Sequence, residues 1–126
     1  MPLNKPHILY IEDHEDTREL VELVLRQRDY DVTTSGSIQA AVELASENRY
    51  DLYLLDSWLP DGSGLDLCRK IREFDTRTPI LFYSAAAYEI DRELALRSGA
   101  QGYLIKPSQN SELCDLVSLL IEDRAA

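Results

Sequence analysis

The chain has 126 residues, of which 44% are hydrophobic and 29% are charged, a composition typical of a globular protein with one core. Its formal net charge of −10 argues against a nucleic-acid-binding surface, which needs a basic patch, and against adsorption to anionic membranes. Because we find neither a signal-peptide pattern nor an apolar run of membrane-spanning length, we expect one cytoplasmic domain over residues 1–126, with its core at about 7–123.

Short runs of apolar and β-branched residues predict five strands. The second run alternates in polarity, which indicates a more exposed strand. The third is apolar throughout, which is typical of a strand buried on both faces of a parallel sheet. In chain order the predicted strands are 7–11, 30–34, 52–55, 79–84 and 102–107.

A helical pattern follows each predicted strand. In the first, over 17–28, Leu20, Leu23 and Val24 have the spacing of a core stripe. The second begins at Ser37, a plausible N-cap, and the others cover 65–73, 87–97 and 111–123. Strict alternation of strands and helices predicts an α/β fold, in which helices cover both faces of a parallel sheet through right-handed crossovers.

The two cysteines, Cys68 and Cys114, fall at apolar positions of two of these helices. We therefore interpret them as small buried hydrophobic residues, and not as a disulfide or a metal-binding pair. A reducing, cytoplasmic environment is the simplest setting for such thiols.

Polar residues stand at the carboxyl ends of four of the strands. They are Glu12 and Asp13 after the first strand, Asp56 after the third, Ser84 at the end of the fourth and Lys106 at the end of the fifth. Each has an ordinary explanation when taken alone: Asp56 could cap the next helix, Ser84 could fill a tight turn, and Lys106 could simply reach solvent.

Taken together, these residues predict a site, because the carboxyl ends of parallel strands meet at one edge of the sheet. Three carboxylates there would repel one another unless a cation joins them, and Mg²⁺ suits the oxygens of Asp13 and Asp56. Lys106 and the Ser84 hydroxyl are not needed to bind a metal, but they are what the oxygens of a transferred phosphoryl group require.

These residues belong to a set of motifs that resembles the response-regulator receiver domains of bacterial two-component signalling. Each motif is weak alone, but their combination in this order is highly specific, and the resemblance extends from Ile8 to about Glu122. The motifs are Glu12-Asp13, the strand that ends in Asp56, the turn Leu-Pro-Asp-Gly-Ser-Gly at 59–64, Ser84-Ala85, Gly99-Ala100 and Tyr-Leu-Ile-Lys-Pro at 103–107.

The resemblance implies a role for each of the acidic residues. Asp56 would be the phosphoacceptor, attacking the phosphoryl group of a kinase phosphohistidine or of a small phosphodonor. Asp13, Asp56 and the backbone carbonyl of Trp58 would bind Mg²⁺, with Mn²⁺ as an alternative, and Glu12 would assist through water.

It also implies roles for residues on the later strands. Lys106 would pair with the acyl phosphate. Ser84, followed by Ala85 in its motif, would swing toward the phosphate on activation, and Tyr103 would rotate inward behind it. The peptide bond between Lys106 and Pro107 would be cis.

The fold implied by the resemblance is flavodoxin-like, a (βα)5 sandwich with strand order 2-1-3-4-5. The fourth helix, fifth strand and fifth helix would form the output face. The partners would be a histidine kinase or phosphotransfer protein and an unidentified output protein or domain, and phosphorylation could drive homodimer formation. Such a domain is not an enzyme, beyond slow self-catalysed phosphorylation and dephosphorylation.

Three positions depart from the family's usual pattern. Trp58 stands two residues after Asp56, where the family is variable and often polar, so it could shield the acyl phosphate or be merely a partly exposed loop aromatic. Ala86, two after Ser84, has no side chain to orient water. We therefore hypothesise slow autodephosphorylation, which a phosphoryl half-life of only seconds would contradict. Ser108 replaces a common aromatic after Pro107, which should loosen packing there.

Two other functions remain as alternatives. A pseudo-receiver that acts only as a protein-interaction module is disfavoured by the joint presence of Asp13, Asp56, Ser84 and Lys106. A Mg²⁺-dependent phosphohydrolase that uses an aspartyl phosphate usually has a second aspartate two residues after the nucleophile, and here that residue is Trp58.

Overall fold

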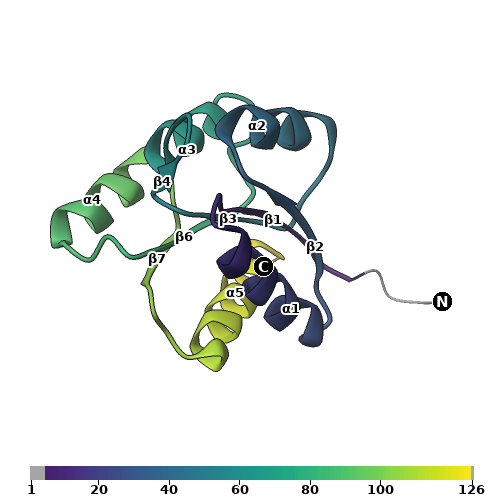
Figure 1. The fold of residues 1–126 in the computed structure, drawn as a ribbon. Coiled ribbons are helices and arrows are strands. Elements are labelled where there is room, and N and C mark those ends of the chain that lie inside the picture. Colours follow the sequence, from purple (N-terminus) through teal and green to yellow (C-terminus); the bar gives the residue numbers. More distant parts are fainter. Residues whose placement is uncertain (1–4, 126) are drawn as a thin grey trace.

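The predicted strands form one parallel sheet in the computed structural model, which describes residues 5–125 (Figure 1). The order of the strands is β2-β1-β3-β6-β7, which in chain order is the predicted 2-1-3-4-5 order of a flavodoxin-like fold. The strands are β1 His7–Ile11, β2 Asp31–Ser35, β3 Leu52–Leu55, β6 Ile80–Ser84 and β7 Gly102–Ile105.

Helices cover both faces of the sheet, as the alternating pattern predicts (Figure 1). The three helices on one face are α2 Ile38–Glu47, α3 Gly64–Arg72 and α4 Glu89–Ser98. The two on the other face are α1 Glu15–Gln27 and α5 Asn110–Ala125. None of the helices within residues 5–125 is long and apolar enough to cross a membrane.

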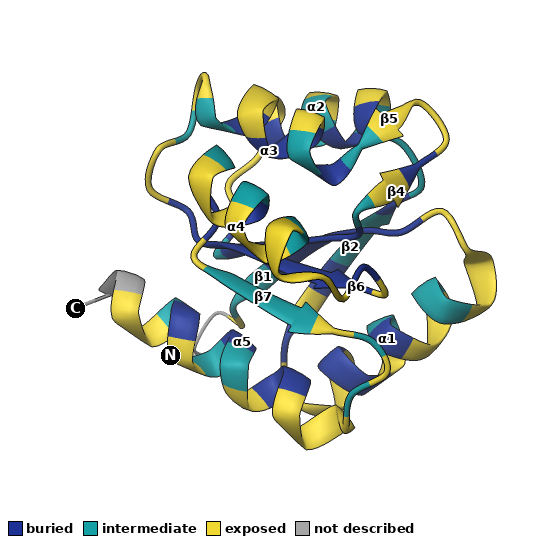
Figure 2. Cartoon of the chain, turned by 90° about the vertical axis from the view of Figure 1, so that its left-hand side faces the viewer, coloured by how far each residue is buried: buried dark blue, intermediate teal, exposed yellow. Residues whose placement is uncertain are grey.

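The third strand lies at the centre of the core. All four of its residues are buried, because alternate side chains enter the two layers of helices. Tyr53 and Leu55 pack in the cluster that includes α2 and α3, whereas Leu52 and Leu54 pack in the one that includes α1 and α5. Figure 2 shows the buried part of the sheet between helices that are exposed on their outer sides.

One prediction about the first helix is wrong. Leu20 and Leu23 are 60% and 54% exposed, and the buried face of α1 instead consists of Val21, Val24 and Leu25. Arg18, one turn before Val21, donates a hydrogen bond of 2.9 Å to the Glu12 carbonyl and so turns this face of the helix toward the sheet. Because apolar residues are crowded between positions 20 and 25, their spacing alone does not select the face.

The third helix starts and ends one residue before its predicted range of 65–73. It begins at Gly64, capped by Ser63, and buries Leu67, Cys68 and Ile71, whereas Leu65 is only half-buried. The thiols of Cys68 and Cys114 are free and buried, as predicted.

The fourth helix is attached to the sheet by few contacts. Ala95 is its one buried residue, and Ile90 and Leu96 are exposed. Its C-terminal end is held by Arg72 of α3, whose guanidinium donates hydrogen bonds of 3.0 and 2.9 Å to the carbonyl of Gly99. Gly99 ends the helix with a φ of 117°, a left-handed conformation that favours glycine.

At the amino-terminal end of the sheet, Asp75 is surrounded by donors. Its carboxylate accepts hydrogen bonds from the hydroxyls of Tyr53 (2.9 Å) and Thr78 (2.6 Å) and from the amides of Arg77 and Thr78 (3.0 Å each). Burial opposes ionisation, but these hydrogen bonds outweigh it and lower the pKa of Asp75 to about 2.

We expect Asp75→Asn to lower the free energy of unfolding by about 1–2 kcal/mol at pH 7, because charge-assisted hydrogen bonds become neutral ones on a partly exposed group. A carboxyl group with a lowered pKa stabilises the fold above its unfolded pKa of about 4. That contribution is lost as the pH falls toward about 2. In urea unfolding, the difference in free energy of unfolding between wild type and Asp75→Asn should therefore shrink as the pH falls over this range. A difference that does not depend on pH would contradict the prediction.

Candidate functional site

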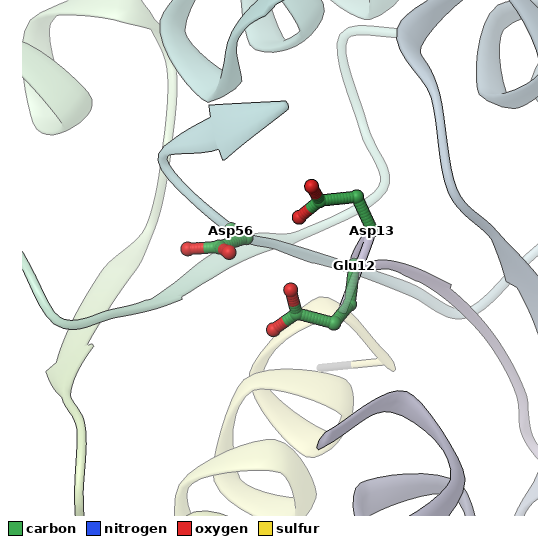
Figure 3. A group of neighbouring side chains, drawn as sticks. All are labelled: Glu12, Asp13 and Asp56. Carbon is green, nitrogen blue, oxygen red and sulfur yellow. The ribbon is translucent and has the colours of Figure 1, made fainter. Parts of the chain in front are cut away.

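Three carboxylates meet at the carboxyl edge of the sheet (Figure 3). Glu12 and Asp13 follow β1 and Asp56 follows the neighbouring β3, so adjacent parallel strands deliver them to the same place. One carboxylate oxygen of each lies within 4.8 Å of the other two. Glu12 and Asp56 are 2% and 8% exposed, whereas Asp13 is exposed, so the cluster is open to solvent on the side of Asp13.

Lys106 brings a positive charge to this cluster from the end of β7. Its ammonium nitrogen lies 2.5 Å from Glu12 Oε1 and 3.8 Å from Asp56 Oδ2, and 5.3 Å from the centre of the Tyr83 ring. The Lys106–Pro107 peptide bond is cis. Lys106 is therefore bound to Glu12 and stands within reach of Asp56.

The backbone holds Asp56 in one orientation. Its amide donates to the carbonyl of Ile11 at 3.1 Å, and its Oδ1 accepts a hydrogen bond of 2.7 Å from the amide of Ser57. The other oxygen, Oδ2, faces Lys106. Burial is the main reason that the pKa of Asp56 is raised to about 6; Lys106 opposes this rise, and Glu12 adds to it.

The pKa of Glu12 is shifted in the opposite direction to that of Asp56. Burial acts to raise its pKa, but hydrogen bonds from Lys106 and from the amide of His14 (3.2 Å) outweigh burial and lower the pKa. Tyr10, beneath the site, has its hydroxyl 3.5 Å from Glu12, and burial raises the pKa of Tyr10. Glu12 is thus the charged partner of Lys106, and Asp56 is the carboxylate with the less compensated charge.

A close backbone approach fixes the chain just after Asp56. The amide of Gly64 donates to the carbonyl of Ser57 at 2.9 Å. A Cβ atom on Gly64 would lie 2.2 Å from the Asp56 carbonyl oxygen and 2.9 Å from Phe82, so only glycine fits. Between them the chain forms a small antiparallel hairpin of β4 Trp58–Leu59 and β5 Gly62–Ser63, where the sequence predicts only a turn.

Ser84 and Tyr103, the residues expected to act as a switch, share Ala86 as a neighbour. Ser84 is fully buried at the end of β6, and its hydroxyl accepts a hydrogen bond of 3.1 Å from the amide of Ala86. The hydroxyl of Tyr103 donates to the carbonyl of Ala86 at 2.6 Å, and its ring stacks on Phe82 at 5.8 Å. Ala85, which lies between Ser84 and Ala86 in the chain, is exposed.

The residues that depart from the family pattern border the site. Trp58 is 61% exposed, and it lines, with Ala86, a hollow of about 100 Å³. Slow autodephosphorylation stays a prediction. Ser108 makes a hydrogen bond of 3.1 Å with the hydroxyl of Tyr83, so a polar contact occupies the place where looser packing is expected.

Three residues that shape the site have no role assigned to them by the sequence patterns. They are Ser57, whose amide orients Asp56, Tyr10 beneath Glu12, and Asp61, whose carboxylate binds the start of α2. Ser57 could have been inferred from its place in the chain next to Asp56. Tyr10 lies in a strand that is buried on both faces, so its pattern does not single it out, and Asp61 finds its partners more than 20 residues away; neither has a local signal.

The residues at this edge fit a magnesium ion. Three converging carboxylates offer the hard oxygen ligands that Mg²⁺ prefers, and the exposure of Asp13 leaves room for the waters that this ion retains. The charge balance also favours a divalent cation, because Lys106 brings a single positive charge to three acids.

Comparison with known proteins gives a consistent result. The family model described as "Response regulator receiver domain" matches residues 8–118. The chain is 39% identical over 106 residues to the response regulator ArlR of Staphylococcus saprophyticus, a match that covers 84% of the chain and 48% of that protein. It is 38% identical over 108 residues to the transcriptional regulatory protein AfsQ1 of Streptomyces coelicolor, covering 86% and 48%. The chain thus spans about half the length of these curated relatives.

A solved structure resembles this fold over almost its full length. It is the receiver domain of the sensor histidine kinase PA1611 from Pseudomonas aeruginosa PAO1, which has a magnesium ion coordinated in its active-site cleft. The two chains superpose with a TM-score of 0.88 at 34% identity, and the match covers 94% of this chain and 99% of the other.

Proposed function

The chain belongs to the response regulator receiver domains, and from this premise we propose that it accepts a phosphoryl group on Asp56 in a Mg²⁺-dependent reaction. The observation that carries the proposal is the meeting of Glu12, Asp13 and Asp56 within 4.8 Å, with Lys106 beside them. Acidic clusters are common, but a cluster with a lysine 3.8 Å from its central, buried carboxylate is suited to phosphoryl transfer.

In the proposed reaction, a carboxylate oxygen of Asp56 attacks phosphorus and forms an acyl phosphate. The bond from phosphorus to the donor breaks, and the donor, the imidazole of a phosphohistidine or a small acid, leaves with the electron pair. Lys106 turns from Glu12 toward the new phosphate, and Ser84 supplies a hydroxyl hydrogen bond. Asp13, Asp56 and the Trp58 carbonyl would hold a divalent cation, whose charge would stabilise the negative phosphoryl oxygens.

The proposed donor is a histidine kinase or a phosphotransfer protein. The proposed output face is formed by α4, β7 and α5, and it carries exposed apolar side chains that a partner or a second copy of the chain could cover. These side chains are Tyr88 just before α4, Ile90 and Leu96 in α4, Ile105 in β7 and Leu119 in α5. Some points stay predictions. They concern the output partner, homodimer formation and the use of Mn²⁺. They also include the absence of nucleic-acid binding, the cytoplasmic location and the single domain with its core at 7–123.

The proposal also concerns what the domain does not do. Trp58 takes the place of the second aspartate that aspartyl-phosphate hydrolases use, so we propose a phosphoacceptor with at most slow self-catalysed turnover. The joint presence of Asp56, Lys106 and a buried Ser84 supports phosphorylation over a pure interaction module.

The single tryptophan provides a direct test, because Trp58 lies in the hairpin that follows Asp56. We expect its fluorescence to change saturably as Mg²⁺ is added, and to change again on addition of a small acyl phosphate such as acetyl phosphate. Intact-mass spectrometry should show one phosphoryl group per chain only when Mg²⁺ is present. A protein that responds to neither addition and incorporates no phosphate would contradict the proposal and point to an interaction module.

A further inference from the structure

The hairpin after Asp56 has a firmly held base. At the base, Gly64 packs against the Asp56 carbonyl, and Ser63 and Asp66 form a capping box that starts α3. The hairpin also carries Trp58, whose carbonyl is the proposed third protein ligand of the metal. Its tip, the turn at Pro60 and Asp61, lies next to the start of α2.

Asp61 ties this tip to the start of α2. Its Oδ1 accepts a hydrogen bond of 2.9 Å from the amide of Ile38, and its Oδ2 accepts one of 3.1 Å from the amide of Gln39. These amides are among the first of the helix, which have no partner within it. They lower the pKa of Asp61, so the carboxylate is charged at neutral pH.

The hairpin also packs directly on this helix. A Cβ atom on Gly62 would lie 2.8 Å from the Cδ1 atom of Ile38, so the hairpin backbone at Gly62 packs against the Ile38 side chain, where β5 lies beside α2 (Figure 2). The helix has a cap of its own as well, since the Ser37 hydroxyl accepts a hydrogen bond of 3.3 Å from the amide of Ala40. Asp61 therefore adds a connection between helix and hairpin that Ser37 does not make.

We propose that Asp61 is a positioning residue of the metal site: by tying the hairpin to α2, it holds the Trp58 carbonyl where a cation can bind it. This inference rests on the proposed function, because Trp58 is a ligand only if the site binds Mg²⁺. Residues that orient a metal ligand without touching the metal typically change the affinity by about 10- to 100-fold when removed. We expect the lower end here, because Asp13 and Asp56 remain.

The experiment compares the full chain with three variants in a Mg²⁺ titration followed by Trp58 fluorescence, repeated as the Mg²⁺-dependent shift in the midpoint of thermal unfolding. We expect Asp61→Ala to raise the Kd for Mg²⁺ about tenfold. Asp61→Asn removes the same charge but keeps one acceptor oxygen, so its Kd should lie between those of Asp61→Ala and wild type. Ser37→Ala removes a cap from the same helix without touching the hairpin, and its Kd should equal that of wild type.

Several results would overturn the inference. A wild-type Kd in Asp61→Ala would make Asp61 only a helix cap. Equal weakening by Ser37→Ala would assign the effect to the stability of α2, and equal weakening by Asp61→Asn would assign it to charge. In each case a wild-type protein that binds Mg²⁺ and incorporates phosphate leaves the proposed function intact. A wild-type protein that does neither overturns both.

Discussion

Phosphoryl incorporation should fall to background, by roughly 10³-fold or more, when Asp56 is replaced by Asn, because a carboxamide is not a nucleophile. The change is nearly isosteric, and the side-chain oxygen can still accept the hydrogen bond from the Ser57 amide. The fold should therefore persist. It should even be slightly more stable at pH 7, since the pKa of Asp56 is raised to about 6 by burial. In wild type, ionisation of Asp56 lowers the free energy of unfolding as the pH rises from about 4 to about 6, whereas an asparagine side chain does not ionise.

The measurement is intact-mass spectrometry after incubation with acetyl phosphate and Mg²⁺, together with urea unfolding of each protein. Asp51→Asn is a matched control at the other end of the same strand, where Asp51 accepts a hydrogen bond of 2.7 Å from the amide of His7. This control should incorporate phosphate like wild type. Incorporation that survives in Asp56→Asn, or that is lost equally in Asp51→Asn, would show that Asp56 is not the acceptor.

A methyl group on Gly64 should be among the most damaging single changes in this domain. The added Cβ would lie 2.2 Å from the carbonyl oxygen of Asp56 and 3.1 Å from its carbonyl carbon, and these backbone atoms cannot rotate away as a side chain can. Overpacking of a core typically costs 1–3 kcal/mol, and a clash with backbone should bring Gly64→Ala to about 3 kcal/mol or more. The displaced backbone belongs to the acceptor, so phosphoryl incorporation should also fall.

Gly36→Ala is the matched control for this substitution. A Cβ atom on Gly36 would meet the guanidinium end of Arg18 at 3.2 Å, and a shift of this side-chain end by a few tenths of an ångström relieves the contact while its hydrogen bond to the Glu12 carbonyl is kept. We expect its free energy of unfolding to lie within about 1 kcal/mol of wild type in a urea titration. If both glycine substitutions cost the same, the close approach to Asp56 would not be the cause.

The sequence predicts the site better than it predicts the faces of the helices. Apolar runs that end in Asp13, Asp56 and Lys106 suffice to place these groups at one edge, because parallel strands all end on the same side. The buried face of α1 was mispredicted because Leu20 fits the helical period as well as Val21 does. The hydrogen bond from Arg18 to the Glu12 carbonyl, a tertiary contact, selects the face with Val21 for burial.

Contacts between residues that are far apart in the sequence are the other feature that sequence patterns do not predict. No sequence pattern predicts the ion pair between the Lys106 ammonium and Glu12, and the pairing of Lys106 with an acyl phosphate stays a prediction. The partners of Asp61 lie 22 and 23 residues away, on a different helix. Local propensity and periodicity contain no information on such contacts, which depend on how the elements meet.

The light attachment of α4 has a consequence for how this domain distributes its stability. The central strand β3 is buried throughout, so its amide hydrogens should exchange with solvent only when the whole domain unfolds. The fourth helix buries Ala95 alone and is held at its end by Arg72, so we expect it to open at a lower free energy than β3. A domain built in this way keeps its chemistry on a rigid support. It leaves a neighbouring helix free to change its population of conformations without unfolding the rest.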